Sequence, residues 1–569
     1  MTMTIWRIQN LISCAVLLTA GLMVSGCGGG KSSEKLNKKD DKKADATSAR
    51  ENLEKRRICK SNLDKVYQIL QPSAENINSE LQAALVILNQ WFGSCADLSK
   101  TQRDAANPLF ADQTDPEFIE NLNSDSVSLG DVLYLRDQLL MRKVVEHVVQ
   151  NSPTDLEKIR AIFEYTCWNI TLDQQLIDPR LASVGLITQE RLNQLDPMTI
   201  PRTLQDIMLA GRGLPQDRIW VFATLLEQLN FDSVILMPPQ SAEANGTSPA
   251  VVLVMIDDQL MAFCPELAVE LQKSSEDANQ LWTATTLSED FTSIFKTFPG
   301  VNFPEGSPIL QMQAIDWKTA EVVLPYAMLS TSRRMEALQI EFAGDMSCTI
   351  YQPLAGDDAN GAGLGVRVSS LLKPVLGERK LTFWSYPHKM YQQSLLASEE
   401  ALTLRELSHA TLMKEVRTVR ANEDQNEEKT YKVNMERQML KARLQQLLGN
   451  ETEALRTYIR IRLQFSVTGT GAAVQFENLM RFLQAEDAQY WSAISQYESQ
   501  GYRAAADTLQ NYVARYPNGR WANSARQLLA NAMEKNEKPA EAVEILKQSE
   551  LPASMNVRKT IDLQHWQTP

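Results

Sequence analysis

The chain has 569 residues, enough for several domains, and its 44% hydrophobic and 22% charged residues are ordinary for globular protein. It carries 57 Lys and Arg residues against 70 Asp and Glu residues, which gives a formal net charge of -13. This balance argues against nucleic acid as a partner, because phosphate binding needs a basic surface.

The N-terminus combines one positive charge, Arg7, with an apolar run over residues 11–24. The run is shorter than the roughly 20 residues that span a bilayer, and it has the length of a signal-peptide core. It ends in Val-Ser-Gly-Cys at residues 24–27, which resembles the lipobox of bacterial lipoproteins. The resemblance implies that residues 1–26 are a signal peptide, that cleavage precedes Cys27, and that lipid on Cys27 holds the chain at a membrane. The alternatives are an ordinary secretory signal and an uncleaved anchor.

A polar segment follows the lipobox. Between residues 31 and 50 it is rich in Lys, Asp, Ser and Ala and has almost no apolar residues. Such a segment cannot bury enough surface to offset its ordering entropy, so we predict a disordered tether over residues 27–50. Its lysines either only keep it soluble or also touch anionic headgroups. Gly28 stands where lipoproteins retained in the inner membrane carry aspartate, so the resemblance implies the outer membrane, facing the periplasm.

Five cysteines remain when the signal peptide and the lipobox are set aside: Cys59, Cys95, Cys167, Cys264 and Cys348. An exported protein meets an oxidising compartment, and Cys59 and Cys95 fall in two consecutive predicted helices. Either these two form a disulfide, or all five are small buried hydrophobes. No two cysteines have metal-site spacing and the four histidines are scattered, so we predict no metal and no cofactor.

Residues 51–150 are predicted to be helical. Apolar residues recur at three- and four-residue spacing over 63–70 and again over 81–91, and Pro72 separates these two helices. A third helix is expected over 132–149. The next helix starts at residues 152–157, where Ser or Thr can cap it, Pro suits the first turn and acidic residues favour the positive dipole end.

The middle of the chain alternates helices and apolar strands. After the helix that ends near Ile170, we expect helices over 204–209 and 218–229, a Gly-Arg-Gly turn at 211–213, and strands over 233–236, 250–255 and 260–263. This order resembles the transglutaminase-like superfamily, whose papain-like core has a Gly-x-Gly-x-Cys turn, a helix opened by the cysteine, and a β-hairpin that supplies histidine and aspartate. The resemblance implies a transglutaminase-like domain over residues 151–300.

The catalytic residues of that family are missing at the matching positions. Pro215 stands at the nucleophile position, the histidine position falls near Ala250, and the aspartate position falls on Cys264. No histidine lies between residues 148 and 387, so the region has no imidazole to act as base. We therefore predict a catalytically degenerate domain with no catalytic residues. The alternative is that Cys167 or Cys264 is a displaced nucleophile rather than a core residue.

Residues 301–395 are predicted to be a mixed α/β region. Strands are expected over 320–324, 338–342, 348–351 and 381–384. They either complete the sheet of the middle domain or form a small module. The stretch 356–361 lacks the alternating ligands and distal Glu of a calcium loop, so we predict a solvated turn there.

Residues 396–569 are predicted to be helical throughout. Three segments, over 447–458, 501–509 and 536–546, each consist of a polar or glycine turn and a helix in which alanine precedes a large residue by four positions. The pairs are Ala454 and Tyr458, Ala505 and Leu509, and Ala542 and Leu546. The pattern resembles tetratricopeptide repeats, whose unit is about 34 residues, and implies a concave surface suited to extended peptides or a partner protein.

Together these features predict an α+β chain with N-terminal helices, a transglutaminase-like core and a C-terminal tetratricopeptide-like array. We expect an envelope lipoprotein, anchored to the membrane, that acts as a non-catalytic scaffold for a protein or peptide partner. One alternative is a thiol-dependent hydrolase or acyltransferase with a displaced nucleophile. Another is a structural envelope protein whose middle domain is only a spacer.

Overall fold

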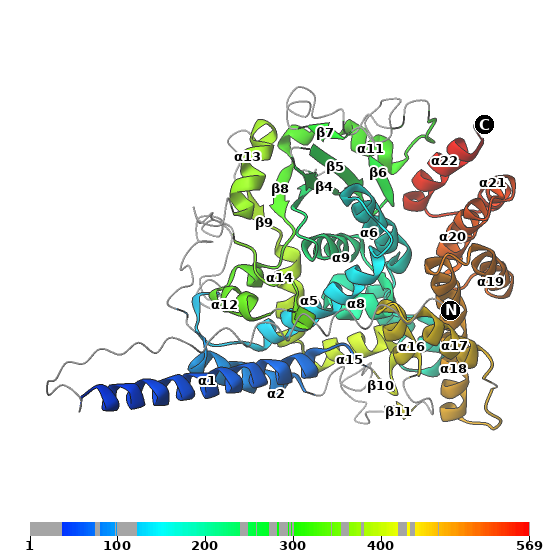
Figure 1. Ribbon diagram of the computed structural model, residues 1–569. Helices are drawn as coiled ribbons and strands as arrows, with labels where there is room; N and C mark the ends of the chain where they lie inside the picture. The colour runs from blue at the N-terminus through cyan, green and yellow to red at the C-terminus, as the bar shows by residue number, and fades with distance from the viewer. Residues whose placement is uncertain are drawn as a thin grey trace, which may run out of the picture. The chain divides into compact units, whose positions relative to one another are not determined.

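The computed structural model in Figure 1 describes residues 37–73, 80–96, 98, 122–238, 249–257, 259–271, 281–283, 294, 298, 301–342, 344–353, 363–376, 381–418, 430–432, 438–464 and 466–567. The chain divides into two compact units, residues 1–60 and residues 61–569. The described residues form helices and a mixed sheet, which confirms the α+β class. Among them, no helix combines the length and the apolar character needed to cross a bilayer.

Helix α1 (Asn37–Leu70) includes residues 37–50 of the segment predicted to be a disordered tether. The prediction for residues 27–50 is therefore wrong from Asn37 onward. The segment is polar, but it has neither Gly nor Pro between residues 31 and 71, and its Lys, Glu, Arg and Ala residues are strong helix formers. Cys27 and the predicted signal peptide lie outside the described residues, as does the stretch 356–361.

The other predicted N-terminal helices are present as α2 (Leu81–Ser94), α5 (Leu129–Val148) and α6 (Asp155–Asn169). The start of α6 confirms the predicted cap. The hydroxyl of Thr154 accepts a hydrogen bond from the backbone N–H of Glu157, and the Glu157 carboxylate accepts one from the backbone N–H of Thr154. This reciprocal pair satisfies two N–H groups that an α-helix leaves without partners.

A seven-stranded sheet forms the core of the middle domain, with strand order β6-β5-β4-β3-β8-β9 and β7 paired to β5. The strands are β3 (Ser233–Met237), β4 (Val251–Ile256), β5 (Gln259–Cys264), β6 (Val269–Leu271), β7 (Trp282–Thr283), β8 (Glu321–Leu324) and β9 (Thr382–Phe383). All pairs are antiparallel except β8 with β9. The strands β3 to β5 predicted from the apolar runs are confirmed.

Helix α9 (Pro215–Glu227) is the buried helix that packs against this sheet, with α6 beside it (Figure 1). Phe163 of α6, Phe222 of α9 and Phe263 of β5 join the three elements, with ring centroids 4.7 to 5.3 Å apart. Such aromatic contacts add to the stabilisation that the buried area itself provides. Two shorter helices, α7 (Gln189–Gln194) and α8 (Leu204–Ala210), precede α9.

Residues 301–395 add strands β8 and β9 to that same sheet, so the first of the two alternatives for this region agrees with the structure. The helices here are α11 (Pro308–Ala314), α12 (Arg333–Glu341), α13 (Leu364–Leu376) and α14 (Ser385–Leu396). The strand predicted over 338–342 is wrong. Apolar residues alternate there as in a strand, but Ile340 is 78% exposed, whereas Met335 and Leu338 are buried at helical spacing.

The strand predicted over 348–351 is also wrong. Side-chain amides, rather than a neighbouring strand, accept the hydrogen bonds of the backbone N–H groups there. Gln339 accepts a hydrogen bond from the N–H of Ile350 at 2.8 Å, and Gln228 accepts one from the N–H of Thr349 at 3.0 Å. Because these N–H groups already donate to side-chain amides, they are not available for hydrogen bonds to a neighbouring strand.

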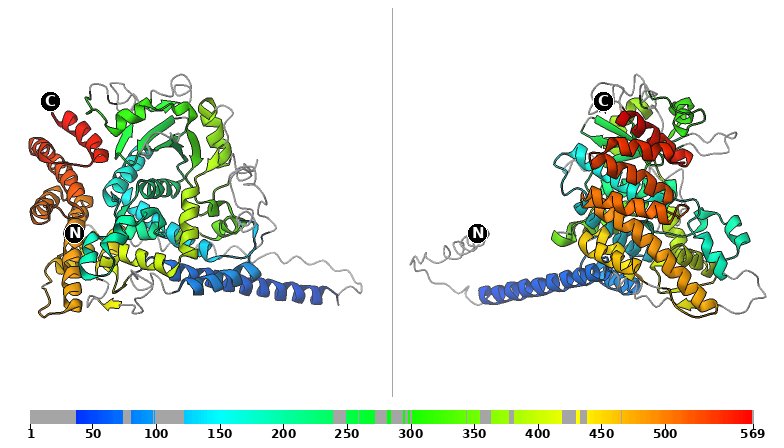
Figure 2. Two further views of the ribbon diagram at one scale, coloured as in Figure 1. Left: turned by 180° about the vertical axis from the view of Figure 1, so that it is seen from behind. Right: turned by 90° about the vertical axis from the view of Figure 1, so that its right-hand side faces the viewer.

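The C-terminal helices stack one on the next (Figure 2). They are α15 (Glu399–Ser408), α16 (Gln438–Leu447), α17 (Glu451–Arg462), α18 (Ala472–Glu498), α19 (Tyr502–Arg515), α20 (Ala522–Lys535), α21 (Pro539–Gln548) and α22 (Ala553–Gln567). All six residues of the alanine and large-residue pairs are fully buried. The region is not helical throughout, because a hairpin of β10 (Glu415–Arg417) and β11 (Thr430–Lys432) interrupts it.

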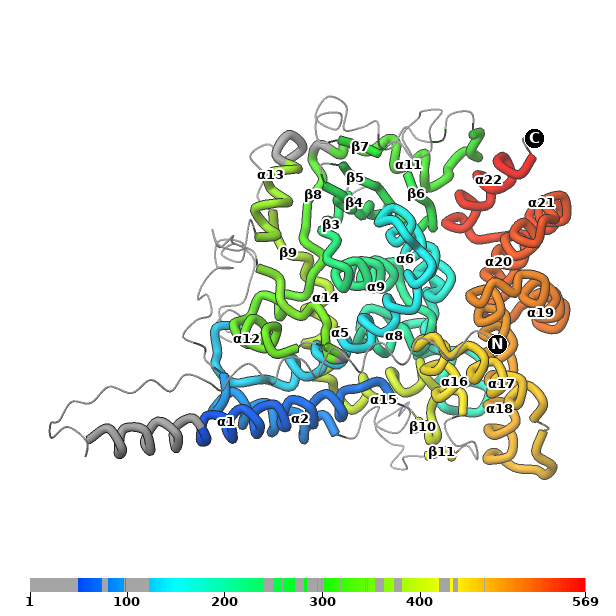
Figure 3. Tube along the Cα trace, in the orientation of Figure 1, coloured from blue at the N-terminus to red at the C-terminus, as the bar shows by residue number. Residues whose placement is uncertain are grey.

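Three-residue turns join α16 to α17, α18 to α19 and α20 to α21. The course of the chain through these helices can be followed in Figure 3. The middle residue of each turn, Gly449, Gln500 or Glu537, has a left-handed backbone with φ of 77°, 61° and 61°. Glycine adopts this conformation freely, whereas other L-residues lose roughly 1 kcal/mol.

Replacing Glu537 by glycine is therefore expected to stabilise the protein by about 0.5–1 kcal/mol, measured as a shift in the urea midpoint. Gly449→Ala is the matched opposite. It adds a Cβ in the left-handed region and places it 2.7 Å from Nδ1 of His147, so we expect a loss of stability. Equal shifts for the two variants would contradict this interpretation.

The first helices of the hairpins, α16, α18 and α20, pack against the middle domain. The hydroxyl of Thr171 donates to Ser524 at 3.1 Å, Arg520 forms an ion pair with Asp178, and Arg443 donates to the carbonyl oxygen of Met208. Thus the middle domain covers the side of the C-terminal helices that α16, α18 and α20 present. The predicted Gly-Arg-Gly turn takes part in this packing, because a Cβ at position 211 would lie 2.2 Å from the Trp491 ring of α18.

Candidate functional site

The three positions that the sequence comparison with the transglutaminase-like family singled out lie at one end of the sheet. Pro215 is the first residue of α9, Ala250 directly precedes β4, and Cys264 ends β5. The register pairs Val252 with Phe263, so the start of β4 lies beside the end of β5. Arg218, one turn into α9, donates to the carbonyl oxygen of Pro265 at 2.9 Å and so links the start of the helix to the same end of the sheet.

A buried carboxylate, rather than a nucleophile, occupies the start of α9. Asp217 accepts hydrogen bonds from the backbone N–H of Leu214 at 2.7 Å, from Nε of Arg202 at 2.8 Å and from the hydroxyl of Tyr386 at 2.6 Å. Arg202 in turn donates to Tyr386 at 2.8 Å, and all three side chains are buried. The positive end of the helix dipole is thus met by the helix's own acid and not by a thiolate.

The free thiols are buried and not activated. Burial raises the pKa of Cys167 to about 11 and of Cys348 to about 12, and it raises the pKa of Cys264 further. Arg218 and Arg558 lower the pKa of Cys167 by less than burial raises it. Since the thiolate is the reactive form, none of these residues has the environment of a nucleophile.

Cys59 and Cys95 are both disulfide-bonded, so the alternative of five free cysteines is wrong. We expect iodoacetamide at pH 7 to label Cys167, Cys264 and Cys348 only after the chain has been unfolded without reductant. Mass spectrometry of the labelled peptides measures this. Rapid labelling of native Cys167 or Cys264 near pH 6 would instead favour the displaced-nucleophile alternative.

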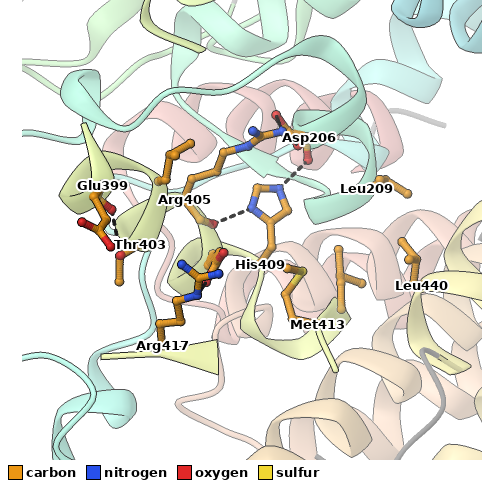
Figure 4. A pocket seen from close by; sticks show the side chains of 12 residues that line it. Asp206, Leu209, Glu399, Thr403, Arg405, His409, Met413, Arg417 and Leu440 are labelled. Atoms are coloured by element: carbon orange, nitrogen blue, oxygen red, sulfur yellow. Dashed lines mark hydrogen bonds and ion pairs between the residues drawn. The ribbon is translucent and has the colours of Figure 1, made fainter. Parts of the chain in front are cut away.

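A hollow of about 220 Å³ lies between α8, α15, β10 and α16 (Figure 4). Its wall is mainly apolar, and Arg405 forms an ion pair with Asp206 at 2.8 Å, which holds the pKa of that carboxyl well below its usual range. The ring nitrogens of His409 lie 2.9 and 3.1 Å from the carbonyl oxygens of Arg405 and Asp206. Because the backbone holds the ring on both sides, His409 positions these helices and is not placed as a free base.

A second hollow, of about 230 Å³, lies between the end of α5, α6 and the junction of α18 with α19, and we call it the α6–α18 groove. Four aromatic residues and two carboxylates characterise its lining: Tyr165, Trp168, Tyr497, Tyr502, Glu164 and Glu498. No Lys or Arg of the described chain is among the lining residues. Sequence reasoning identified the helix that carries Trp168 but not this groove, since its other wall comes from residues more than 300 positions later.

Within the described ranges, no three His, Cys, Asp or Glu side chains gather as metal ligands would. Comparison with known proteins gives no relative from which to assign either hollow. No family model matches the chain, and neither a curated protein nor a solved structure matches it.

Proposed function

We propose that the chain is a membrane-anchored envelope lipoprotein that acts as a non-catalytic scaffold for a protein or peptide partner. Lipid on Cys27 would hold it at the outer membrane, facing the periplasm. The folded part would be a degenerate transglutaminase-like domain joined to a tetratricopeptide-like array. The observation that most directly supports the non-catalytic role is the start of α9, where Pro215 stands at the position matched to the nucleophile and the Asp217 carboxylate, two residues later, is closed off by Leu214, Arg202 and Tyr386.

The contacts between the middle domain and the array support a scaffold whose surfaces keep a fixed geometry. Buried ion pairs and hydrogen bonds join them from α16 to α22, where Arg558 donates to the carbonyl oxygen of Ala268 at 3.2 Å. Because α16, α18 and α20 face the middle domain, a partner would meet the hollows along this seam or the outward helices α17, α19 and α21.

A combined turnover and cross-linking experiment tests the proposal. The purified, lipid-bearing protein is incubated with glutamine-containing peptides and a labelled amine, with Cys264→Ala as control, and photo-cross-linking is run in intact envelopes. We expect no turnover above the control and a defined cross-linked protein or peptide. Transamidation or hydrolysis above the Cys264→Ala rate would overturn the non-catalytic scaffold.

Substituting Cys27 by serine is expected to move the protein from the membrane fraction to the soluble fraction. The substitution removes the thiol that would receive the lipid, and the polar residues that follow cannot hold a chain in a bilayer alone. Fractionation with metabolic labelling by an alkyne fatty acid measures the change, and Cys14→Ser is the matched control. Membrane retention of the Cys27→Ser chain without label would show that the anchor is not lipid.

A further inference from the structure

The α6–α18 groove combines aromatic walls with carboxylates, and this combination is specific enough to name a ligand class. We propose that it binds the side chain of a lysine or arginine from a basic, extended segment of a partner polypeptide. The inference rests on the proposed scaffold function and names the partner's chemistry.

The aromatic side chains come from both walls of the groove. Tyr165 and the half-buried Trp168 project from one face of α6, and Tyr497 and Tyr502 line the opposite wall with ring centroids 5.2 Å apart at 69°. Ring faces attract ammonium and guanidinium groups, and Trp does so most strongly. An apolar ligand would also contact these rings, so the charges of the groove decide between the two classes.

The carboxylates give the groove its negative character. Glu164 is exposed at the rim, and Glu498 lies further in, where it accepts hydrogen bonds from Asn169 at 2.7 Å and from Gln446 at 3.0 Å. Burial nevertheless raises the pKa of Glu498, because the hydrogen bonds from Asn169 and Gln446 and the charge of Arg443 offset the loss of solvation only in part. A cation from a ligand would supply the missing compensation.

The basic side chains in and beside the groove already have partners. Arg558, which interacts electrostatically with Glu164, forms an ion pair with Asp562 at 2.8 Å. The guanidinium of Arg443 donates to Met208 and Asn169 and stacks 3.5 Å from the ring centroid of Trp491. His147 is paired with Glu451 at 2.7 Å. Since these basic groups have their own partners and no Lys or Arg is among the lining residues, a ligand cation can reach the rings and the carboxylates directly.

The size of the groove favours a single side chain over a whole small molecule. Its volume of about 230 Å³ is below the roughly 300–1,000 Å³ of common ligand pockets. A long side chain on an extended peptide would fill it while the peptide backbone remains outside. The net charge of -13 favours the approach of a basic segment over an acidic one.

The test uses the full-length, lipid-bearing protein in detergent and a fluorescein-labelled peptide, Gly-Ser-Lys-Ser-Gly-Lys-Ser-Gly. The comparison peptide has norleucine in place of lysine. Fluorescence anisotropy gives the Kd. We expect the lysine peptide to bind and the norleucine peptide to bind at least about tenfold more weakly, because only the first carries the cation. Equal affinities would overturn the inference, since the groove would then recognise apolar chains.

Matched variants locate the binding. Trp168→Ala is expected to raise the Kd about fivefold or more, whereas Trp168→Phe, which keeps a ring, raises it less. Phe482→Ala on the same helix as Glu498 but outside the groove, and Glu453→Gln on α17, leave it unchanged. Thermal unfolding confirms that each variant is folded. If Trp168→Ala and Phe482→Ala have the same Kd, the peptide binds elsewhere and the inference is wrong.

The pH dependence provides an independent readout. Besides Glu498 itself, the groups that face it are Arg443 of α16, His147 of α5, Tyr165 of α6 and Tyr458 of α17. A cation favours the ionised carboxylate, so binding releases a proton and affinity rises with pH. Glu498→Gln should weaken binding and flatten this slope. A slope that persists in Glu498→Gln would contradict a role for this carboxylate.

The chain's own lysines over residues 31–43 are a competing source of the same cation. If glutamine at these positions tightens peptide binding about tenfold or more, the groove's occupant is the N-terminal segment and the partner assignment is overturned. Unchanged affinity supports the assignment. If envelope cross-linking captures the same partner with Trp168→Ala as with wild type, this inference fails while the scaffold proposal stands. Turnover above the Cys264→Ala control would overturn the scaffold proposal, independently of the result of the peptide-binding experiment.

Discussion

Replacing Asp217 by alanine is expected to lower the free energy of unfolding by roughly 3–5 kcal/mol, because it leaves a buried arginine without its partner. Arg202 is only 4% exposed and Asp217 is fully buried. The substitution also removes the hydrogen bonds from Tyr386 and from the backbone of Leu214. Urea denaturation followed by tryptophan fluorescence measures the shift.

A matched set of variants separates the charge effect from the lost hydrogen bonds. Asp217→Asn keeps acceptors near Tyr386 but removes the charge, so it should fall between wild type and alanine. Asp155→Ala removes an exposed acid from the first turn of α6 and should lower the free energy of unfolding by well under 1 kcal/mol. If Asp217→Ala were as mild as Asp155→Ala, the start of α9 would not be the closed structure described above.

Replacing Glu227 by glutamine is expected to stabilise the protein at alkaline pH and to change little at pH 5. Glu227 is the last residue of α9 and is 2% exposed; one of its carboxyl oxygens has no hydrogen-bond partner, and Gln352 contacts the group. Burial raises its pKa to about 8. Its ionisation also raises the pKa of the neighbouring Tyr134 and Tyr326.

The sign follows from proton linkage. The folded state holds the proton on Glu227 more tightly than the unfolded chain, so the stability it contributes is full below the unfolded pKa of about 4.5 and is lost as pH rises to about 8. Glutamine mimics the protonated acid at all pH values. At pH 8 we therefore expect a gain of roughly 4 kcal/mol in unfolding free energy, measured by urea titration from pH 5 to 9. If the free energies of unfolding of wild type and Glu227→Gln changed in parallel between pH 5 and 9, the prediction would be contradicted. Glu453→Gln, which changes an exposed residue, is the control.

Local signals predicted most of the elements around the site. Thr154 and Glu157 stand at capping-box spacing, so the start of α6 could be located from sequence. The apolar runs of β4 and β5 reflect strands buried on both faces. The alternation of apolar and polar residues at 338–342 predicted a strand wrongly, because Ile340, which continues the alternation, is an exposed residue of helix α12.

The side-chain networks of the site could not be predicted in the same way. Asp217 meets Tyr386 across 169 positions of sequence, and Asn169 meets Glu498 across 329. No local pattern marks such pairs, since each residue is also an ordinary helix residue. The absence of histidine between residues 148 and 387 can be seen in the sequence, but the partners that surround Asp217 at the start of α9 depend on tertiary packing.

The packing of α16, α18 and α20 on the middle domain bears on how this chain can change length in evolution. Arrays of repeats commonly gain or lose whole units, because each unit contacts only its neighbours. Here a duplicated hairpin inserted before α20 would displace Arg520 from Asp178 and Ser524 from Thr171 together. The contacts with the middle domain therefore fix the number of helical hairpins between α16 and α21. We expect homologous chains to differ in length beyond α22 or within loops rather than in this number.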